Sequence, residues 1–209
     1  TERLEGRKEL VESQVAALGS LSASLRTALR VEIARKTLLG HALFVQLSTL
    51  GATWCHAFCQ DGFELTAWSA KDDIFFASDV SRAAYVLTKG NASYASEVRP
   101  GEMLMESQPS EVVLPGMWLA EASLWSEWVH VGKAVAVTPA QVFQVFPTAL
   151  FRSTRGFPDI CHVAREYGKQ FHRRIVCAGS NGLAFPSDLE VPCTDWEDMV
   201  LSMDSEVQR

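Results

Sequence analysis

The sequence lacks several features that would place it at once in a functional class. No apolar run approaches the ~20 residues that cross a bilayer, and residues 1–14 carry mixed charge without the apolar core of a signal peptide. A surplus of basic residues is also missing. The net charge is -6, and a surface of that sign repels nucleic-acid phosphates. We therefore expect no membrane span within this chain and no nucleic-acid partner.

Residues suited to catalysis or metal binding are scarce as well. Cys55 and Cys59 form a single C-x3-C with His56 between them, and no second pair follows at the spacing of a zinc site. No serine or cysteine lies in a nucleophile elbow, and no glycine-rich loop has the pattern of a P-loop. The histidines also lack the spacing of a cupin-like metalloenzyme. We expect reduced thiols, no metal site and no enzymatic activity.

Helical patterns occupy the first quarter of the chain. Apolar residues recur at helical spacing over 3–18 and again over 21–36, where basic residues occupy the other faces. Gly40 ends the second run, and the apolar residues over 43–47 predict a short turn that packs onto whatever follows. These patterns define an N-terminal helical linker, residues 1–53.

From about residue 54 the pattern changes to short strands separated by turn signals. Segments rich in β-branched and aromatic residues recur about every ten residues, which is typical of a jelly roll or barrel. The predicted strands are Phe63–Trp68, Ile74–Phe76, Ala84–Thr88, Ser93–Val98, Met103–Met105, Val112–Leu114, Ala134–Thr138 and Val142–Phe146.

Helix returns at Pro158, a residue suited to a first helical position. One apolar stripe runs from Ile160 to Ile175 at i, i+3/i+4 spacing. Residues 54–178 therefore form the second predicted unit, a β-roll with a closing helix. Residues 179–209 are turn-rich and acidic, and predict an extended tail with one short helix near Trp196–Met203.

Four patterns resemble the cyclic-nucleotide-binding domain family, as in cyclic-nucleotide-gated and related potassium channels, and along the chain they follow the family's order. Residues 72–90, DDIFFASDVSRAAYVLTKG, are similar to the family signature. The helical linker before the roll is matched by residues 24–47, SLRTALRVEIARKTLLGHALFVQL. Within it, residues 41–44, HALF, resemble the x-P-L-F that docks on the roll. Phe157-Pro158 is similar to the start of the lid helix. The resemblance implies an α+β fold: an antiparallel β-roll (jelly roll) with an N-terminal helical linker and a C-terminal lid helix.

The family's phosphate-binding cassette is matched only in part. In members that bind nucleotide, a short helix begins with Gly-Glu, and the Glu accepts a hydrogen bond from the ribose hydroxyl. Here Leu119 precedes Ala120, which replaces the glycine, and Glu121 matches the carboxylate. His130 stands near the place of the family's phosphate-binding arginine, and Lys133 follows three residues later. The resemblance makes these five residues the candidate nucleotide-binding set.

The missing arginine weakens that site. A neutral imidazole cannot replace a bidentate guanidinium, and an ammonium acts only as a point charge. Losing a charge-assisted pair of this kind costs about 2–5 kcal/mol. We expect cyclic AMP or cyclic GMP to bind weakly if at all. Trp118, Trp125 and Trp128 crowd the same segment, and we expect them to fill the empty pocket or to contact a protein partner.

The sequence therefore predicts a regulatory or docking module with a degenerate ligand site. We expect protein partners in a larger assembly, such as a membrane channel or its accessory subunit, and a cytoplasmic location that includes the cytosolic face of a membrane. A domain that senses cyclic nucleotide and gates an effector stays open as the alternative, because Glu121 is retained.

Overall fold

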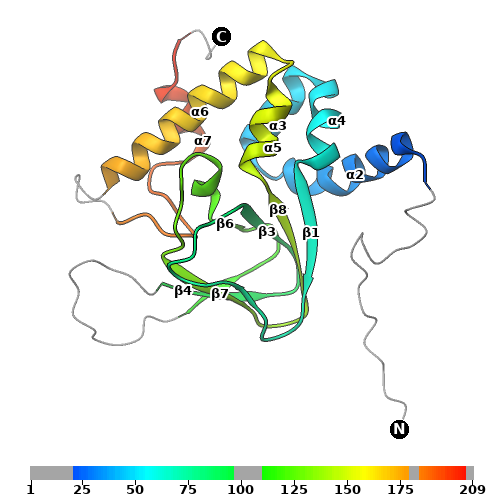
Figure 1. Cartoon of the computed structure of the whole chain (residues 1–209). Coiled ribbons are helices and arrows are strands. Elements are labelled where there is room, and N and C mark those ends of the chain that lie inside the picture. The colour runs from blue at the N-terminus through cyan, green and yellow to red at the C-terminus, as the bar shows by residue number, and fades with distance from the viewer. Residues whose placement is uncertain (1–20, 97–109, 179–183, 206–209) are drawn as a thin grey trace.

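The computed structural model describes residues 21–96, 110–178 and 184–205. In these residues the strands form two antiparallel four-stranded sheets, and the helices gather at one end of them (Figure 1). The expectation of a mixed α+β fold with antiparallel sheets is confirmed. The predicted strand at 103–105 and the predicted helix over 3–18 lie outside the described residues.

The first sheet has the order β1-β8-β3-β6. Its strands are β1 (Phe63–Trp68), β8 (Ala140–Val145), β3 (Ala84–Lys89) and β6 (Trp118–Leu119). Four successive residues of β3, from Ala84 to Leu87, are buried, as expected of a strand covered on both faces. Strand β3 therefore lies at the centre of the core, whereas only Phe63 of the edge strand β1 is buried.

The second sheet has the order β2-β7-β4-β5. Its strands are β2 (Asp73–Phe75), β7 (Gly132–Ala136), β4 (Ala92–Ser96) and β5 (Glu111–Val113). Burial alternates strictly along β7, so that its small residues face the core and the residues between them face outward. The face of β7 that carries Lys133 is thus the outer one.

Among the described residues, three helices precede the sheets: α2 (Ala23–Leu38), α3 (Ala42–Leu50) and α4 (Ala52–Asp61). Ser22 caps α2 by accepting a hydrogen bond from the Leu25 amide at 3.3 Å. Arg30 fastens α2 to the body of the protein, since its Nε donates to the Cys59 carbonyl at 2.7 Å and its Nη2 to the Phe63 carbonyl at 2.6 Å.

Three more helices follow the sheets: α5 (Pro147–Thr154), α6 (Pro158–Cys177) and α7 (Trp196–Ser202). Helix α6 begins at Pro158 as predicted, and its apolar stripe is buried from Ile160 to Phe171, whereas Ile175 is partly buried. The short helix α7 also lies where the sequence placed one. Among the described residues, no helix is both long and apolar enough to cross a membrane.

Some elements differ from the sequence predictions. Residues 43–47 belong to a helix of nine residues, α3, rather than to a short turn. Helices α4 and α5 and the two-residue strand β6 were not predicted. The boundary drawn between residues 53 and 54 falls inside α4, because this helix carries Trp54 and Phe58 into the core.

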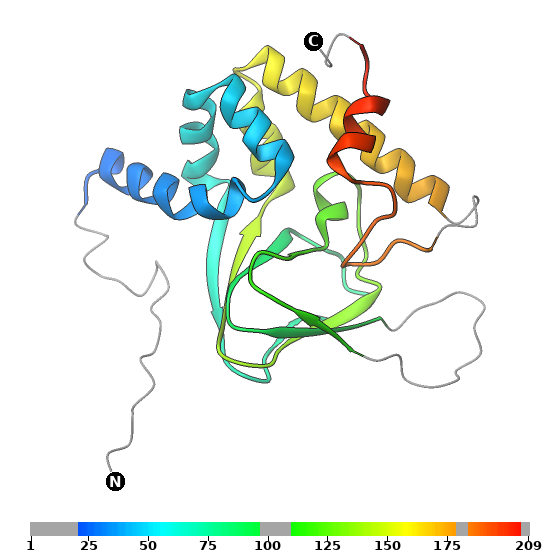
Figure 2. The same cartoon turned by 180° about the vertical axis from the view of Figure 1, so that it is seen from behind.

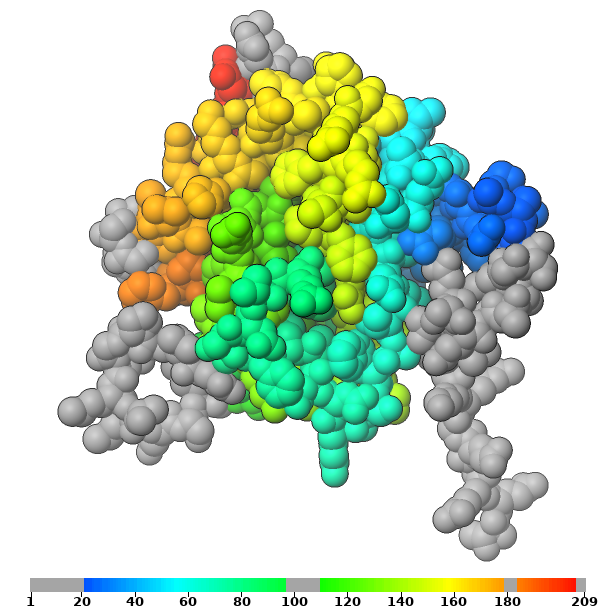
Figure 3. Space-filling model, in the orientation of Figure 1, coloured from blue at the N-terminus to red at the C-terminus, as the bar shows by residue number. Residues whose placement is uncertain are grey.

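The C-terminal segment, residues 184–195, is part of the folded body. It passes from the end of α6 across the roll beside η2, the 3₁₀ helix Glu121–Leu124, and then leads into α7 (Figure 2). Asp188, Val191, Met199 and Met203 are buried. From outside, a small part of the segment is visible beside the C-terminal end of α6 (Figure 3).

Candidate functional site

The most heavily hydrogen-bonded polar group of the interior is the carboxylate of Asp188, which is 2% exposed. Its Oδ1 accepts hydrogen bonds from Trp128 Nε1 at 2.8 Å and from His130 Nδ1 at 2.7 Å. Its Oδ2 accepts from Tyr94 Oη at 3.0 Å and from the backbone amides of Val131 and Gly132 at 2.9 and 3.0 Å. We call these donors the anion cradle.

The roll builds the anion cradle from two places in the chain. Residues 128–132 lead into β7, and the Val80–Val129 bridge holds them against residues 78–81. His130 is fixed by a stack on Phe75, with ring centroids 3.8 Å apart. Tyr94 enters from β4. Burial raises the pKa of its phenol and the charge of Asp188 raises it further, so the hydroxyl stays a donor.

The backbone of the candidate cassette also binds the C-terminal segment. Ala120 has φ 52° and ψ 37°, in the left-handed region that glycine adopts without strain. Its amide donates to the Asp188 carbonyl at 2.5 Å. The cassette therefore has the backbone shape of a Gly-Glu turn although Ala stands there, and its leading N–H is used within the chain.

Glu121 bonds to two other elements. Its Oε1 lies 2.9 Å from His41 Nε2, at the start of α3, and accepts a hydrogen bond from Tyr167 Oη of α6 at 3.4 Å. Burial raises the pKa of Tyr167, and the carboxylate of Glu121 adds to the shift. Glu121 thus joins the linker helices, the cassette and the lid helix at one point.

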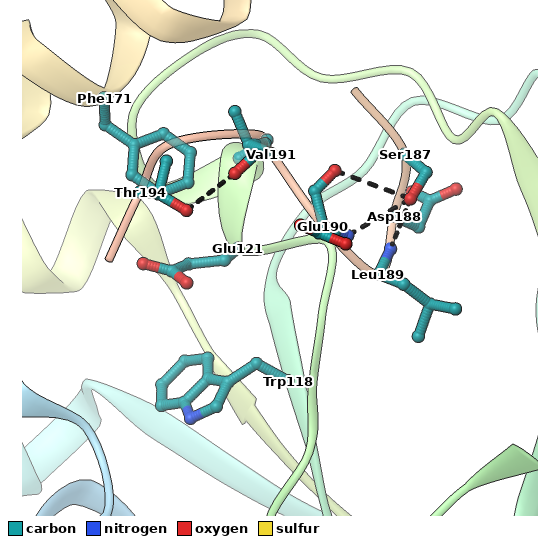
Figure 4. A pocket seen from close by; sticks show the side chains of 10 residues that line it. Trp118, Glu121, Phe171, Ser187, Asp188, Leu189, Glu190, Val191 and Thr194 are labelled. Atoms are coloured by element: carbon teal, nitrogen blue, oxygen red, sulfur yellow. Dashed lines mark hydrogen bonds between the residues drawn. The ribbon is translucent and has the colours of Figure 1, made fainter. Parts of the chain in front are cut away.

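A small cavity remains beside Glu121. It encloses about 90 Å³ between η2, Phe171 of α6 and residues 187–194. Figure 4 shows Glu121 and Trp118 on one side and the C-terminal segment on the other. Pockets for drug-sized ligands enclose about 300–1,000 Å³, so this cavity is too small for a nucleotide while the segment stays in place.

The three tryptophans of the cassette lie in different elements. Trp118, on β6, stacks on Phe44 with centroids 5.8 Å apart and lines the cavity. Trp125 packs on Tyr167 and so close to Gly168 that a Cβ there would lie 2.7 Å from the indole. Trp128 is 8% exposed and belongs to the anion cradle. Trp128 therefore contributes to the filled site, whereas contact of Trp118 or Trp125 with a partner stays a prediction.

Of the remaining candidate residues, one lies in the anion cradle and two lie outside it. His130 lies in the anion cradle, and Leu119 is buried in β6, where it pairs with Tyr85 of β3. Lys133 points to the outer face of β7, where its Nζ pairs with Asp73 at 2.8 Å and lies 5.0 Å from the centre of the Phe76 ring. The structure therefore brings Ala120, Glu121 and His130 to one region and leaves Lys133 out.

Arg174 of α6 holds the far end of the C-terminal segment. Its Nε donates to the Cys193 carbonyl, and its Nη2 donates to the Asp198 carbonyl at 2.9 Å and to Ser202 Oγ at 2.8 Å. The segment is thus fixed at Asp188 by the roll and at residues 193–202 by the lid helix.

Sequence reasoning missed Asp188, Tyr94, His41 and Tyr167. Asp188 stands in an acidic, turn-rich stretch that reads like a solvated tail, and Tyr94 lies 94 residues away from it in the chain. The available signal was indirect: a cassette without its arginine leaves amide and indole donors that need another acceptor.

Comparisons with known proteins add little. No family model matches the chain, and neither does any curated protein. Among solved structures, the chain is similar to the crystal structure of the N-terminal domain of a transcriptional regulator from Streptomyces coelicolor A3(2). The identity is 18%, the match covers 71% of this chain and 96% of that one, and the TM-score is 0.49. At these values the similarity carries no weight for fold or function.

Proposed function

We propose that the chain is a regulatory or docking module with a cyclic-nucleotide-binding-like jelly roll, whose ligand site is filled by its own C-terminal segment. The observation that carries the proposal is the carboxylate of Asp188 in the anion cradle. A group with one negative charge occupies donors of the kind that bind a phosphate, namely consecutive backbone amides, an indole and an imidazole.

The strand order supports the jelly-roll part of the proposal. Eight strands in two four-stranded sheets, ordered 1-8-3-6 and 2-7-4-5, are the arrangement that two Greek keys produce when they fold over each other. The position of α6 against η2 agrees with a lid helix. The sequence patterns that resemble the family therefore lie on elements of the expected kind.

The degenerate site follows from charge and space. Where the family has an arginine that pairs with the phosphate, this chain has His130, which already donates to Asp188. Lys133, the other cation expected near the site, is paired with Asp73 on the outer face. A nucleotide would have to displace a carboxylate that has no exposed edge and would gain no guanidinium in return. Such a module acts through protein contacts within a larger assembly.

The second candidate function is a domain that senses cyclic nucleotide. Glu121 favours it, since the carboxylate expected to bind a ribose hydroxyl is retained and lines the cavity. In that case nucleotide would displace residues 184–195, and the carboxylate of Glu121 would give up its hydrogen bond with His41 and accept one from the ribose hydroxyl.

Calorimetry with cyclic AMP and cyclic GMP distinguishes the two. For the wild-type chain we expect a Kd no tighter than high micromolar, and for Asp188→Ala a measurable gain, because the cradle donors lose their acceptor. His130→Arg in the Asp188→Ala background should tighten binding further, whereas Lys133→Ala should change nothing. A submicromolar Kd for the wild-type chain would refute the filled site and favour the sensing domain.

A further inference from the structure

The small cavity beside Glu121 has walls of two kinds. Trp118 of β6 and Phe171 of α6 supply aromatic rings, while Glu121 of η2 and Glu190 of the C-terminal segment supply carboxylates. In Figure 4 these four side chains lie around the space between η2 and the segment. Aromatic faces and carboxylates both attract positive charge, and the rings also accept alkyl groups. The walls are therefore complementary to an organic cation.

Both carboxylates have oxygens available for a ligand. Glu121 uses Oε1 for its two hydrogen bonds, and its Oε2 accepts none from any residue that the structure describes. Glu190 is exposed, and its printed bonds, all to Ser187, use its backbone groups. Arg174, which holds the segment, donates to carbonyl oxygens and to a hydroxyl. Two carboxylates with available oxygens thus adjoin one cavity.

The size of the cavity and the groups in its walls define the class of ligand. It encloses about 90 Å³, whereas an apolar cavity of about 150 Å³ holds benzene, so about four non-hydrogen atoms fit. In the described part of the chain, no group of three or more ligating side chains could hold a metal ion. A short alkyl chain with one ammonium group suits both kinds of wall, and such an amine stays protonated at neutral pH, as lysine does.

We propose that this cavity binds a small free primary alkylammonium ion, such as n-propylammonium, between the cassette and the C-terminal segment. The ammonium donates to Glu121 Oε2 and to the carboxylate of Glu190, and the alkyl chain lies against Trp118 and Phe171. An ion in this place links η2 to the segment and so holds the segment in the roll. The inference rests on the proposed filled site, because residues 187–194 form one wall of the cavity.

Titration of the full chain with n-propylammonium chloride, followed by NMR, measures the binding. A ligand of four non-hydrogen atoms should reach a Kd of about 1 mM, within the limit known for very small ligands. The signals that shift should belong to residues that line the cavity, above all the Trp118 indole N–H and the amides of Leu189 and Glu190. Ionic strength is kept constant with potassium chloride, so that general screening does not contribute.

Two other probes test the charge and the source of the ligand. 1-Propanol has the same size without the charge, and it should bind at least about tenfold more weakly because it makes no charge-assisted hydrogen bond. Nα-acetyl-lysine amide carries the ammonium on a peptide unit that the cavity cannot enclose. It should also bind more weakly than n-propylammonium, and tighter binding would assign the site to a lysine of a partner protein instead.

Three variants locate the site. Glu121→Gln and Glu190→Gln each remove one negative charge and keep the volume of the side chain, and each should weaken n-propylammonium binding about five- to tenfold. Glu190 is exposed, so its variant tests the site without disturbing the fold. Glu197→Gln on α7 is the matched control, because Glu197 is an exposed carboxylate outside the lining of the cavity, and it should leave the Kd unchanged.

Hydrogen exchange over residues 184–195 gives a second reading. At ten times its Kd, n-propylammonium should slow exchange of the segment about tenfold, since a ligand of the closed form stabilises it in proportion to 1 + [L]/Kd. The amine site is overturned if n-propylammonium shifts no lining signal, if 1-propanol or acetyl-lysine amide binds as tightly, or if both glutamine variants bind like the wild-type chain. Protection of the segment without amine tests the filled site separately, and it persists if the amine site alone is wrong.

Discussion

At the scale of single residues, Asp188 is the buried acceptor on which the proposed filled site depends. Its carboxylate has no exposure to solvent, and each oxygen accepts from more than one donor. A buried charge of this kind is tolerated only when hydrogen bonds replace its hydration. Removing the carboxylate would leave the donors of Trp128, His130 and Tyr94 without their acceptor.

Asp188→Asn should lower the free energy of unfolding by about 2–4 kcal/mol, because charge-assisted bonds are lost and the new amide group faces donors. Urea unfolding followed by tryptophan fluorescence measures this. Glu190→Gln is the matched control: the residue is exposed two positions away, and its change should stay within about 0.5 kcal/mol. Equal effects of the two substitutions would mean that Asp188 is not held as described.

Some candidate site residues could be chosen from local patterns, and their role in binding nucleotide stays a prediction. Ala120 and Glu121 were placed from a short motif, and His130 from its distance to the following strand. Asp188 could not be placed, because its contacts with Tyr94 and His130 join residues 94 and 58 positions apart. The direction of the Lys133 side chain could not be predicted, since the alternation along β7 decides it and the register was not known.

At the scale of elements, the lid helix and the C-terminal segment act as one unit. Arg174 links α6 to the segment through the carbonyls of Cys193 and Asp198 and the hydroxyl of Ser202. This side chain also satisfies a backbone carbonyl of α7, which has no basic residue in its last turn. The segment is therefore retained by contacts at Cys193, Asp198 and Ser202 as well as by Asp188 itself.

Arg174→Gln should raise hydrogen exchange in peptides from residues 184–205 by at least tenfold, while exchange in β3 and β8 stays as in the wild-type chain. Mass spectrometry of the exchanged peptides gives both readings. Arg165→Gln is the control on the same helix, because Arg165 is exposed and its Nη2 donates to Cys161 Sγ at 3.8 Å, within α6 itself. Unchanged exchange in Arg174→Gln would show that Arg174 does not retain the segment.

Elements differed in how well the sequence predicted them, and the reasons are physical. Helix α6 has a long apolar stripe behind a proline, and both signals are local. Helix α4 was missed because its buried Trp54 and Phe58 are as common in strands as in helices, and it is too short for its period to decide. Strand β6 has two residues, and it exists only through its pairing with β3.

At the scale of the whole molecule, all three tyrosines of the chain are held in their neutral form. Burial is the largest cause that raises the pKa of each, with Asp188 adding to Tyr94 and Glu121 to Tyr167. In the unfolded chain a tyrosine loses its proton near pH 10. Above that pH the folded state binds more protons than the unfolded state. The contribution of the three tyrosines to stability is therefore fully present below about pH 10 and is lost as the pH rises.

We expect a loss of up to about 1.4 kcal/mol per pH unit for each tyrosine above pH 10. Tyrosinate absorbance, measured together with circular dichroism, should therefore remain low until the chain unfolds, and then appear in one transition. A gradual rise of tyrosinate absorbance centred near pH 10, with the dichroism unchanged, would show that the three phenols are not buried as described.

The central claim is that the chain's own Asp188 occupies the anion cradle, and NMR of the Trp128 indole N–H tests it most directly. This group donates to Asp188 Oδ1 at 2.8 Å, beside the amides of Val131 and Gly132. In the wild-type chain all three N–H signals should be protected from exchange and should stay in place when cyclic AMP is added at low micromolar concentration. In Asp188→Ala they should lose protection and shift with added nucleotide. Signals of the wild-type chain that shift and saturate at micromolar nucleotide, with loss of protection over residues 184–195, would contradict the account.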